Sequence, residues 1–132
     1  MNTTYFLNCV SGNVFKTKTS PALPTAYYVG LSTATPTIAG TGAKEPAGSD
    51  YVRQALSGKL GAPTDGLISN TSSIDFPTSE TNWGTVTHFV IYDAQTGGNL
   101  LMYGALTTPR TVEPDTIMTL KPGALKLSVS NP

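Results

Sequence analysis

The chain has 132 residues, of which 39% are apolar and 12% are charged, and this fits one domain with a single core. Eight basic residues balance eight acidic ones, and Lys16 and Lys18 form the only close basic pair, which argues against a nucleic-acid partner. The single cysteine, Cys9, excludes an intrachain disulfide, and the sequence shows neither a signal-peptide pattern nor the roughly 18 apolar residues of a membrane span.

The segment from Asn2 to Phe15 is the only plausible helix. Apolar residues recur there at spacings of three and four: Tyr5, Phe6, Cys9, Val10 and Val14. Asn2, Thr3 or Thr4 could cap its start, whereas Gly12 and the β-branched residues weaken it, so a strand followed by a turn is the alternative. Residues 16–25, which contain Pro21 and Pro24, read as a connector.

The rest of the chain alternates between short apolar patterns and turn-rich loops. Alternation of side chains predicts strands at 27–32, 51–56, 74–76, 85–92, 99–106, 117–120 and 124–130. The loops 33–48 and 57–72 are rich in Thr, Gly, Pro or Asn, and the first is longer than most loops in a compact domain, which hints at a contact. Residues 109–115 are expected to be another connector, and Lys121-Pro122-Gly123 a turn.

The clearest local signal is a β-hairpin of residues 85–92 and 99–106. Its loop, 93–98, ends in Gly97-Gly98, which adopt a positive φ easily. Alternation places one set of side chains on one face and Phe89 and Ile91 on the other; the first set is Val86, His88, Val90 and Tyr92. Because both faces are largely apolar, the first strand should be central in its sheet.

These elements predict an all-β fold. We expect a single-domain β-sandwich of jelly-roll or Greek-key type, because connections of very unequal length suit those folds. The domain covers residues 1–132, with a short N-terminal helix and connector at 1–25 and the sandwich at 26–130.

The sequence offers no catalytic, cofactor or metal site. His88, the only histidine, falls in mid-strand without a nucleophile motif, so we interpret it as a packed or half-buried residue. One histidine and Cys9, far apart, fall short of a zinc set. The carboxylates considered are scattered and lack a calcium-loop pattern: Asp50, Asp65, Asp75, Glu80, Asp93, Glu113 and Asp115. Spacing alone leaves a pair for glycoside cleavage open, but no sugar cleft is indicated. We predict that the protein is not an enzyme.

The aromatic residues are more typical of a core than of a binding site. Trp83 should close the end of the sandwich core, with a role as a binding aromatic as the alternative. The tyrosines are expected in the core or on sheet faces, although a fraction of them could serve an interface: Tyr27, Tyr28, Tyr51, Tyr92 and Tyr103. Arg53 is expected to be a solvated or locally paired strand charge; it could pair with a neighbouring carboxylate, such as Asp50 or Asp75.

Several sequence pieces together resemble a known family. They are Tyr28-Val29-Gly30-Leu31-Ser32, Glu45-Pro46 with Gly48 and Tyr51-Val52-Arg53, Ile74-Asp75-Phe76-Pro77, Trp83-Gly84-Thr85-Val86-Thr87-His88-Phe89, Asp93, Thr96-Gly97-Gly98-Asn99-Leu100-Leu101, Tyr103-Gly104-Ala105-Leu106 and Pro122-Gly123. From about residue 1 to 130, the chain resembles a family of small tailed-phage proteins that are often labelled tail fibre proteins. The resemblance implies a bacteriophage virion structural protein, and it carries over no catalytic residue.

Within that family, the missing shaft and trimerising repeat favour a capsid decoration (cement) protein that binds the major capsid protein and stabilises the head shell. The alternative is a small tail, neck or fibre component that contacts other tail proteins or sugars of the host surface. Made in the host cytoplasm, the protein would act in the virion, as a trimer or dimer, without nucleic acid or membrane. The 33–48 loop, the 57–72 loop and the N-terminal segment are the expected contacts.

Overall fold

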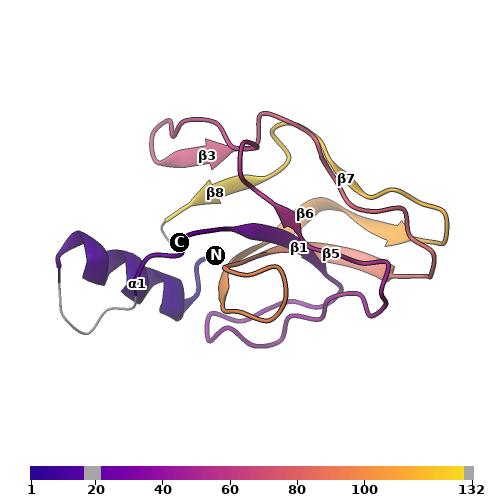
Figure 1. Ribbon diagram of the computed structural model, residues 1–132, viewed down its shortest axis with the longest axis horizontal. Coiled ribbons are helices and arrows are strands. Elements are labelled where there is room, and N and C mark those ends of the chain that lie inside the picture. Colours follow the sequence, from indigo (N-terminus) through magenta and orange to yellow (C-terminus); the bar gives the residue numbers. More distant parts are fainter. Residues whose placement is uncertain (17–21, 130–132) are drawn as a thin grey trace.

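A computed structural model of the chain describes residues 1–16 and 22–129 (Figure 1). It is mostly β, with one helix near the N-terminus, as the sequence predicts. The elements in chain order are α1 (Thr4–Val14), β1 (Tyr28–Ser32), β2 (Gln54–Ala55), β3 (Leu67–Ser69), β4 (Ile74–Asp75), β5 (Gly84–Tyr92), β6 (Leu100–Val112), β7 (Thr119–Leu120) and β8 (Lys126–Ser128). Part of the predicted connector, 17–21, and the end of the last predicted strand, at Ser130, lie outside the described residues.

Helix α1 is capped and anchored by one side chain. Of the three candidate caps, Thr3 is the one used: its Oγ1 accepts a hydrogen bond from the Phe6 N–H at 3.3 Å. The same hydroxyl donates to the Leu100 carbonyl at 2.7 Å. The helix therefore begins at a residue that is fixed to β6, and it buries Phe6, Cys9 and Gly12.

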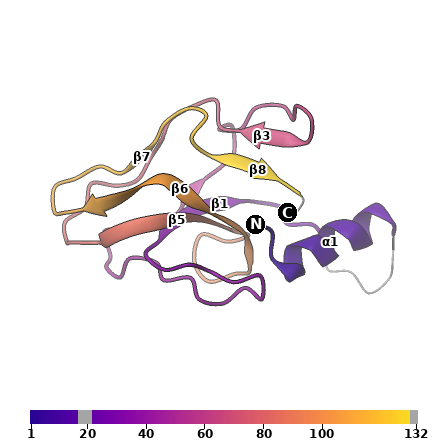
Figure 2. The same ribbon diagram turned by 180° about the vertical axis from the view of Figure 1, so that it is seen from behind.

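Four antiparallel strands form the main sheet, in the order β2-β1-β5-β6. Three of them, β1, β5 and β6, are labelled in Figure 2. β5 lies between β1 and β6, so the prediction of a central strand is confirmed. The predicted hairpin is confirmed too, since β5 pairs with β6 and residues 93–99 connect them, with φ of +63° at Gly97 and +76° at Gly98.

Two short ribbons pack against one face of this sheet. β3 pairs with β8 and β4 pairs with β7. Their side chains join Val29, Leu31 and Ile91 of the sheet in the main core, and Phe6 of α1 packs there as well. β3 lies inside the segment 57–72, which was predicted to be a loop, so that prediction is wrong at 67–69. The strand has three residues and its partner lies near the far end of the chain, which leaves little local signal.

A β-bulge between β5 and β6 changes which side chains share a face. Val86 pairs with Arg110 and His88 with Ala105, so that Thr87 alone faces the four residues 106–109. Val86 is consequently buried in the main core with Ile91, and not on the face of Val90 as strict alternation predicted. β6 also continues to Val112 through Pro109, where a connector was expected. Proline is tolerated because the bulge needs no ladder N–H there.

Other predicted strands are shorter in the structure. Only Gln54–Ala55, Thr119–Leu120 and Lys126–Ser128 remain paired in the predicted segments 51–56, 117–120 and 124–130. The turn at Lys121-Pro122-Gly123 is confirmed, with φ of +82° at Gly123. The observed pairing is a four-stranded sheet with two ribbons, and the jelly-roll or Greek-key sandwich stays a prediction.

The loop 33–48 covers the second face of the main sheet. Ala43 packs against a smaller cluster formed by Val90, Leu100 and Tyr103. The loop is closed by hydrogen bonds from the Thr33 N–H to the Lys44 carbonyl at 2.9 Å and from the Thr37 N–H to the Thr41 carbonyl at 2.8 Å. Its tip, residues 37–42, is exposed.

Buried Asn70 holds the turn between β7 and β8. Its side-chain amide donates to the Lys121 carbonyl at 2.9 Å, and its Oδ1 accepts from the Leu125 N–H at 2.9 Å. Its backbone carbonyl also accepts from the Gly123 N–H at 2.8 Å. Asn70 therefore satisfies backbone groups of Lys121, Gly123 and Leu125 that a neighbouring strand would otherwise bond.

We predict that Asn70→Ala lowers the free energy of unfolding by about 1–3 kcal/mol, because it leaves buried backbone groups at Lys121 and Leu125 unsatisfied. Urea unfolding followed by circular dichroism measures the change. Gln95→Ala, at an exposed position, is the control and should stay within about 0.5 kcal/mol of the parent. Equal stability of the two variants would contradict the role of Asn70.

Candidate functional site

Arg53, next to β2, is the centre of a buried polar cluster. It is 7% exposed and forms the one ion pair between described residues, with Glu45. Its Nη2 lies 2.5 Å from Glu45 Oε1 and its Nε lies 3.0 Å from Oε2, which gives the bidentate geometry of a planar guanidinium on a carboxylate. Arg53 is therefore a locally paired charge, as one of the two readings had it, but it is buried and its partner is Glu45, not the suggested Asp50 or Asp75.

The same guanidinium holds the loop of the β5–β6 hairpin. Nη1 donates to the Ala94 carbonyl at 2.8 Å and to the Gly97 carbonyl at 2.7 Å. The guanidinium carbon, Arg53 Cζ, lies 3.6 Å from the centroid of the Tyr92 ring, which is a cation–π contact. We call these groups the Arg53 clamp: Arg53, Glu45, Tyr92 and the carbonyls of Ala94 and Gly97. The clamp joins the segment 45–53 to the loop 93–98.

Tyr51 connects the clamp to the core. Its hydroxyl donates to Glu45 Oε2 at 2.5 Å and accepts from the Leu31 N–H of β1 at 2.9 Å. Its ring stacks on Phe76, with centroids 6.2 Å apart, and meets Trp83 edge-on at 5.4 Å. Gly30 makes room for it, because a Cβ there would lie 2.4 Å from the Tyr51 hydroxyl.

The protonation states follow from this packing. Burial first, and then the hydrogen bond and charge of Glu45, raise the pKa of Tyr51. Burial and the Glu45 charge likewise raise the pKa of Tyr92. For Arg53, burial acts to lower the pKa, but the hydrogen bond and charge of Glu45 outweigh it and raise the pKa. The clamp is thus a charged arginine and carboxylate among neutral phenols at neutral pH.

A second anchor sits beside the clamp, at Asp50. Its Oδ2 accepts hydrogen bonds from the Glu80 N–H at 2.7 Å, the Thr81 N–H at 3.1 Å and the Trp83 indole N–H at 2.8 Å. The Glu80 N–H contributes most to lowering the pKa of Asp50 to about 2, followed by Trp83 and Thr81. Trp83 is 4% exposed and belongs to the main core, which confirms the predicted core role and leaves no exposed ring for a ligand.

The tyrosines lie where the sequence placed them. Tyr27 and Tyr51 pack against the main core, Tyr92 packs against the smaller cluster, and Tyr103 belongs to that cluster. Tyr28 is half-buried in β1.

The other candidate residues, His88 and Cys9, are packed side chains with local hydrogen bonds. His88 is half-buried, its Nδ1 lies 2.8 Å from the Thr87 hydroxyl, and burial lowers its pKa. The Cys9 thiol is buried and donates to the Ala22 carbonyl at 3.2 Å. Within residues 1–16 and 22–129, no three His, Cys, Asp or Glu side chains gather where they could hold a metal ion. Over the same residues, no helix is both long and apolar enough to span a membrane.

The Arg53 clamp fixes the positions of two loops, and its charged groups are already engaged in hydrogen bonds, so they are not placed to act on a substrate. A hollow of about 600 Å³ adjoins the clamp, lined by Glu45, Pro46, Tyr51, Val52, Arg53, Gln95, Thr96 and Gly97. The charged groups in it already bond to each other and to backbone carbonyls, while Gln95 and Thr96 are exposed. The site can therefore present two loops in fixed positions to a partner.

Sequence reasoning missed Glu45 as a functional residue. It was absent from the carboxylates considered, although Glu45, Gly48, Tyr51 and Arg53 stood together in one piece of the family resemblance. Their grouping in that piece was the available signal. What it could not show is that the carbonyls of Ala94 and Gly97 complete the site.

Comparison with protein families identifies the chain. The family described as "Podophage GP4 fiber I protein gp80" matches residues 2–128, so the chain belongs to this family. A comparison with curated proteins gave no match. The chain is therefore a phage fibre protein of the virion, structural and non-enzymatic, which confirms the family resemblance and the prediction that it is not an enzyme; the fibre role was the alternative prediction. This finding favours the fibre over capsid decoration, which the absence of a shaft had wrongly suggested.

We predict that Arg53→Met lowers the free energy of unfolding by about 3 kcal/mol, because it leaves the Glu45 carboxylate without its partner. Arg53→Lys should lose less, since it keeps the charge but not the planar fork. Arg110→Met, at an exposed arginine, is the matched control. Urea unfolding and amide exchange at Ala94–Gly98 report the effect; unchanged exchange in Arg53→Met would contradict the clamp.

We predict a pH effect from Asp50. Its folded-state pKa of about 2 lies below the ordinary 3.8, so its carboxylate stabilises the fold above about pH 4, and this stabilisation is lost as the pH falls towards 2. Asp50→Asn should be less stable than the parent at pH 7 and should lose less stability between pH 4 and 2. Urea midpoints across that range test this, with Asp65→Asn as the control; parallel pH profiles for Asp50→Asn and the parent would refute it.

Proposed function

We propose that this fibre protein binds neighbouring tail or fibre proteins through its loop end, the surface formed by residues 33–53 and 93–98. Membership of the fibre family over residues 2–128 carries the proposal. The Arg53 clamp supports the choice of surface, because it fixes two loops that are distant in sequence. Loops that are ordered before binding lose less conformational entropy when the complex forms.

The proposed contact surface keeps the 33–48 loop expected from the sequence, adds residues 49–53 and 93–98, and leaves out the 57–72 loop and the N-terminal segment. In the segment 57–72, β3 is paired with β8. The N-terminal residues are also engaged, since the Thr3 N–H donates to the Leu101 carbonyl and the Tyr103 N–H to the Met1 carbonyl, both at 2.9 Å. The tip 37–42 remains exposed at the loop end, and its Ile38 is 47% exposed.

The assembly is proposed to be symmetric. Most homo-oligomers have closed symmetry, in which each copy uses equivalent surfaces, so we propose a dimer or trimer of single-domain sandwiches. Sedimentation equilibrium of the purified chain measures the stoichiometry. Binding of host sugars by stacking on Trp83 gains no support, because that ring is buried.

We predict that Ile38→Asp abolishes incorporation into virions while the purified protein keeps its unfolding midpoint, because the substitution places a charge on an exposed apolar contact. Ile117→Asp, at another isoleucine that is 56% exposed, is the matched control and should be incorporated normally. Quantitative immunoblotting of purified particles measures incorporation, and immunogold labelling shows the position. Label over the head, or full incorporation of Ile38→Asp, would refute the proposal.

A further inference from the structure

The outer edge of β6 is only partly covered. Residues 1–3 pair with its first part, where the Tyr103 N–H and the Leu101 carbonyl point outwards. Since alternate residues of a strand direct their N–H and C=O groups to the same edge, those of Ala105 point outwards as well. The residues 106–109 that follow have no ladder partner in β5, because they form the bulge.

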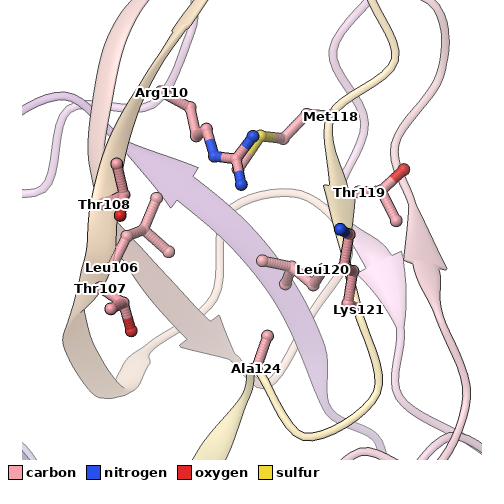
Figure 3. Close-up of a pocket in the computed structure, with 9 residues that line it drawn as sticks. All are labelled: Leu106, Thr107, Thr108, Arg110, Met118, Thr119, Leu120, Lys121 and Ala124. Carbon is pink, nitrogen blue, oxygen red and sulfur yellow. The ribbon is translucent and has the colours of Figure 1, made fainter.

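The same part of β6 lines a trough. Two grooves, of about 130 and 340 Å³, share Thr107 and Ala124 and together run along the outer edge of β6. One wall is the part of β6 from Met102 to Arg110, and the other is the segment from Met118 to Ser128. Figure 3 shows the first groove, with Leu106, Thr107 and Thr108 on the β6 side and Met118 and Leu120 opposite. We call the two grooves the β6 trough.

The charge of the trough has one sign. Arg110, Lys121 and Lys126 line it, and no acidic residue does. The Arg110 side chain extends from β6 across the groove towards Met118 (Figure 3). None of the three forms an ion pair with a residue that the structure describes. The outward backbone groups of Ala105, next to these three cations, match a ligand that offers both main-chain hydrogen bonds and carboxylates.

We propose that the β6 trough binds an extended, acidic segment of another virion protein, which adds to the outer edge of β6 as a strand. This inference rests on the proposed function, since it names the chemistry of a partner of the fibre protein. The main-chain bonds form at Ala105 and along the bulge. The carboxylates of the segment face Arg110, Lys121 and Lys126, and its apolar side chains contact Leu106 and Leu120.

A second copy of this chain fits the trough less well. Pairing of two β6 edges about a twofold axis would bring two copies of the same three cations together, and facing like charges destabilise a pair of strands. A simple polyanion would satisfy the cations but not the backbone groups of Ala105 and the bulge. The occupant is therefore expected to be peptide.

A designed peptide tests the proposal on the full-length protein. The probe is a seven-residue peptide of alternating Val and Glu with blocked ends, and its binding is followed by the amide shifts of 15N-labelled protein. We expect shifts at Ala105–Thr108. Two matched probes should lose at least about tenfold in affinity: the Val–Lys peptide, and the Val–Glu peptide N-methylated at the amides that would face β6.

Variants assign the binding to the trough. The double variant Arg110→Glu with Lys121→Glu should weaken the Val–Glu peptide at least about tenfold, whereas Lys44→Glu, on the loop across the sheet, should leave it within about twofold. Ala105→Pro removes the outward N–H and should also weaken binding, since proline is tolerated at a strand edge. Should that variant fail to fold, the N-methylated probe gives the same information on the unaltered protein.

Three outcomes would overturn the inference: no binding of the Val–Glu peptide, equal binding of its N-methylated form, or equally tight binding of inorganic polyphosphate at the same residues. The last would indicate a purely electrostatic patch. None of these affects incorporation of Ile38→Asp into virions, so failure of the trough and failure of the proposed function are read from separate experiments.

Discussion

The loop end of this protein depends on one buried charge. A guanidinium that is almost fully removed from water is tolerated only if it is neutralised and hydrogen-bonded, and Arg53 obtains both from Glu45, Ala94 and Gly97. The cost of burying the charge favours this arrangement of the two loops, because a displacement of Glu45 or of the carbonyls of Ala94 and Gly97 would leave the guanidinium without an acceptor. An arginine suits this position since its rigid fork serves several acceptors at once.

The Arg53 clamp and the main core are joined by shared contacts. Tyr51 shares Glu45 with Arg53 and accepts a hydrogen bond from β1, and its ring packs between Phe76 and Trp83. Trp83 in turn donates to Asp50. Tyr51 therefore couples the Arg53 clamp to the main core, so that a displacement of one would shift the other. The segment 45–53 and the loop 93–98 are therefore tied to β1 and to the main core through Arg53 and Tyr51.

Features that depend on residues close together in sequence were predicted, and features that depend on residues far apart in sequence were not. The helix capped by Thr3 and the β5–β6 hairpin were predictable, because period, cap and Gly97-Gly98 turn are local signals. β3 was missed because its partner lies near the other end of the chain, and the bulge was missed because alternation assumes an uninterrupted strand. In the site, the core role of Trp83 was predictable from its position before β5. The Glu45–Arg53 pair was not, since spacing does not say which of several carboxylates folds back.

The same contrast bears on the order of folding. The β5–β6 hairpin closes a short loop, whereas the ribbons β3–β8 and β4–β7 join segments that are far apart along the chain. Loop closure becomes entropically more costly with length, and long-range pairing slows folding. We therefore expect the hairpin to form early and the wall of residues 118–128 to dock late. During that interval the outer edge of β6 beyond Tyr103 would lack its opposite wall, so an extended segment present at synthesis could pair with it before the chain has finished folding.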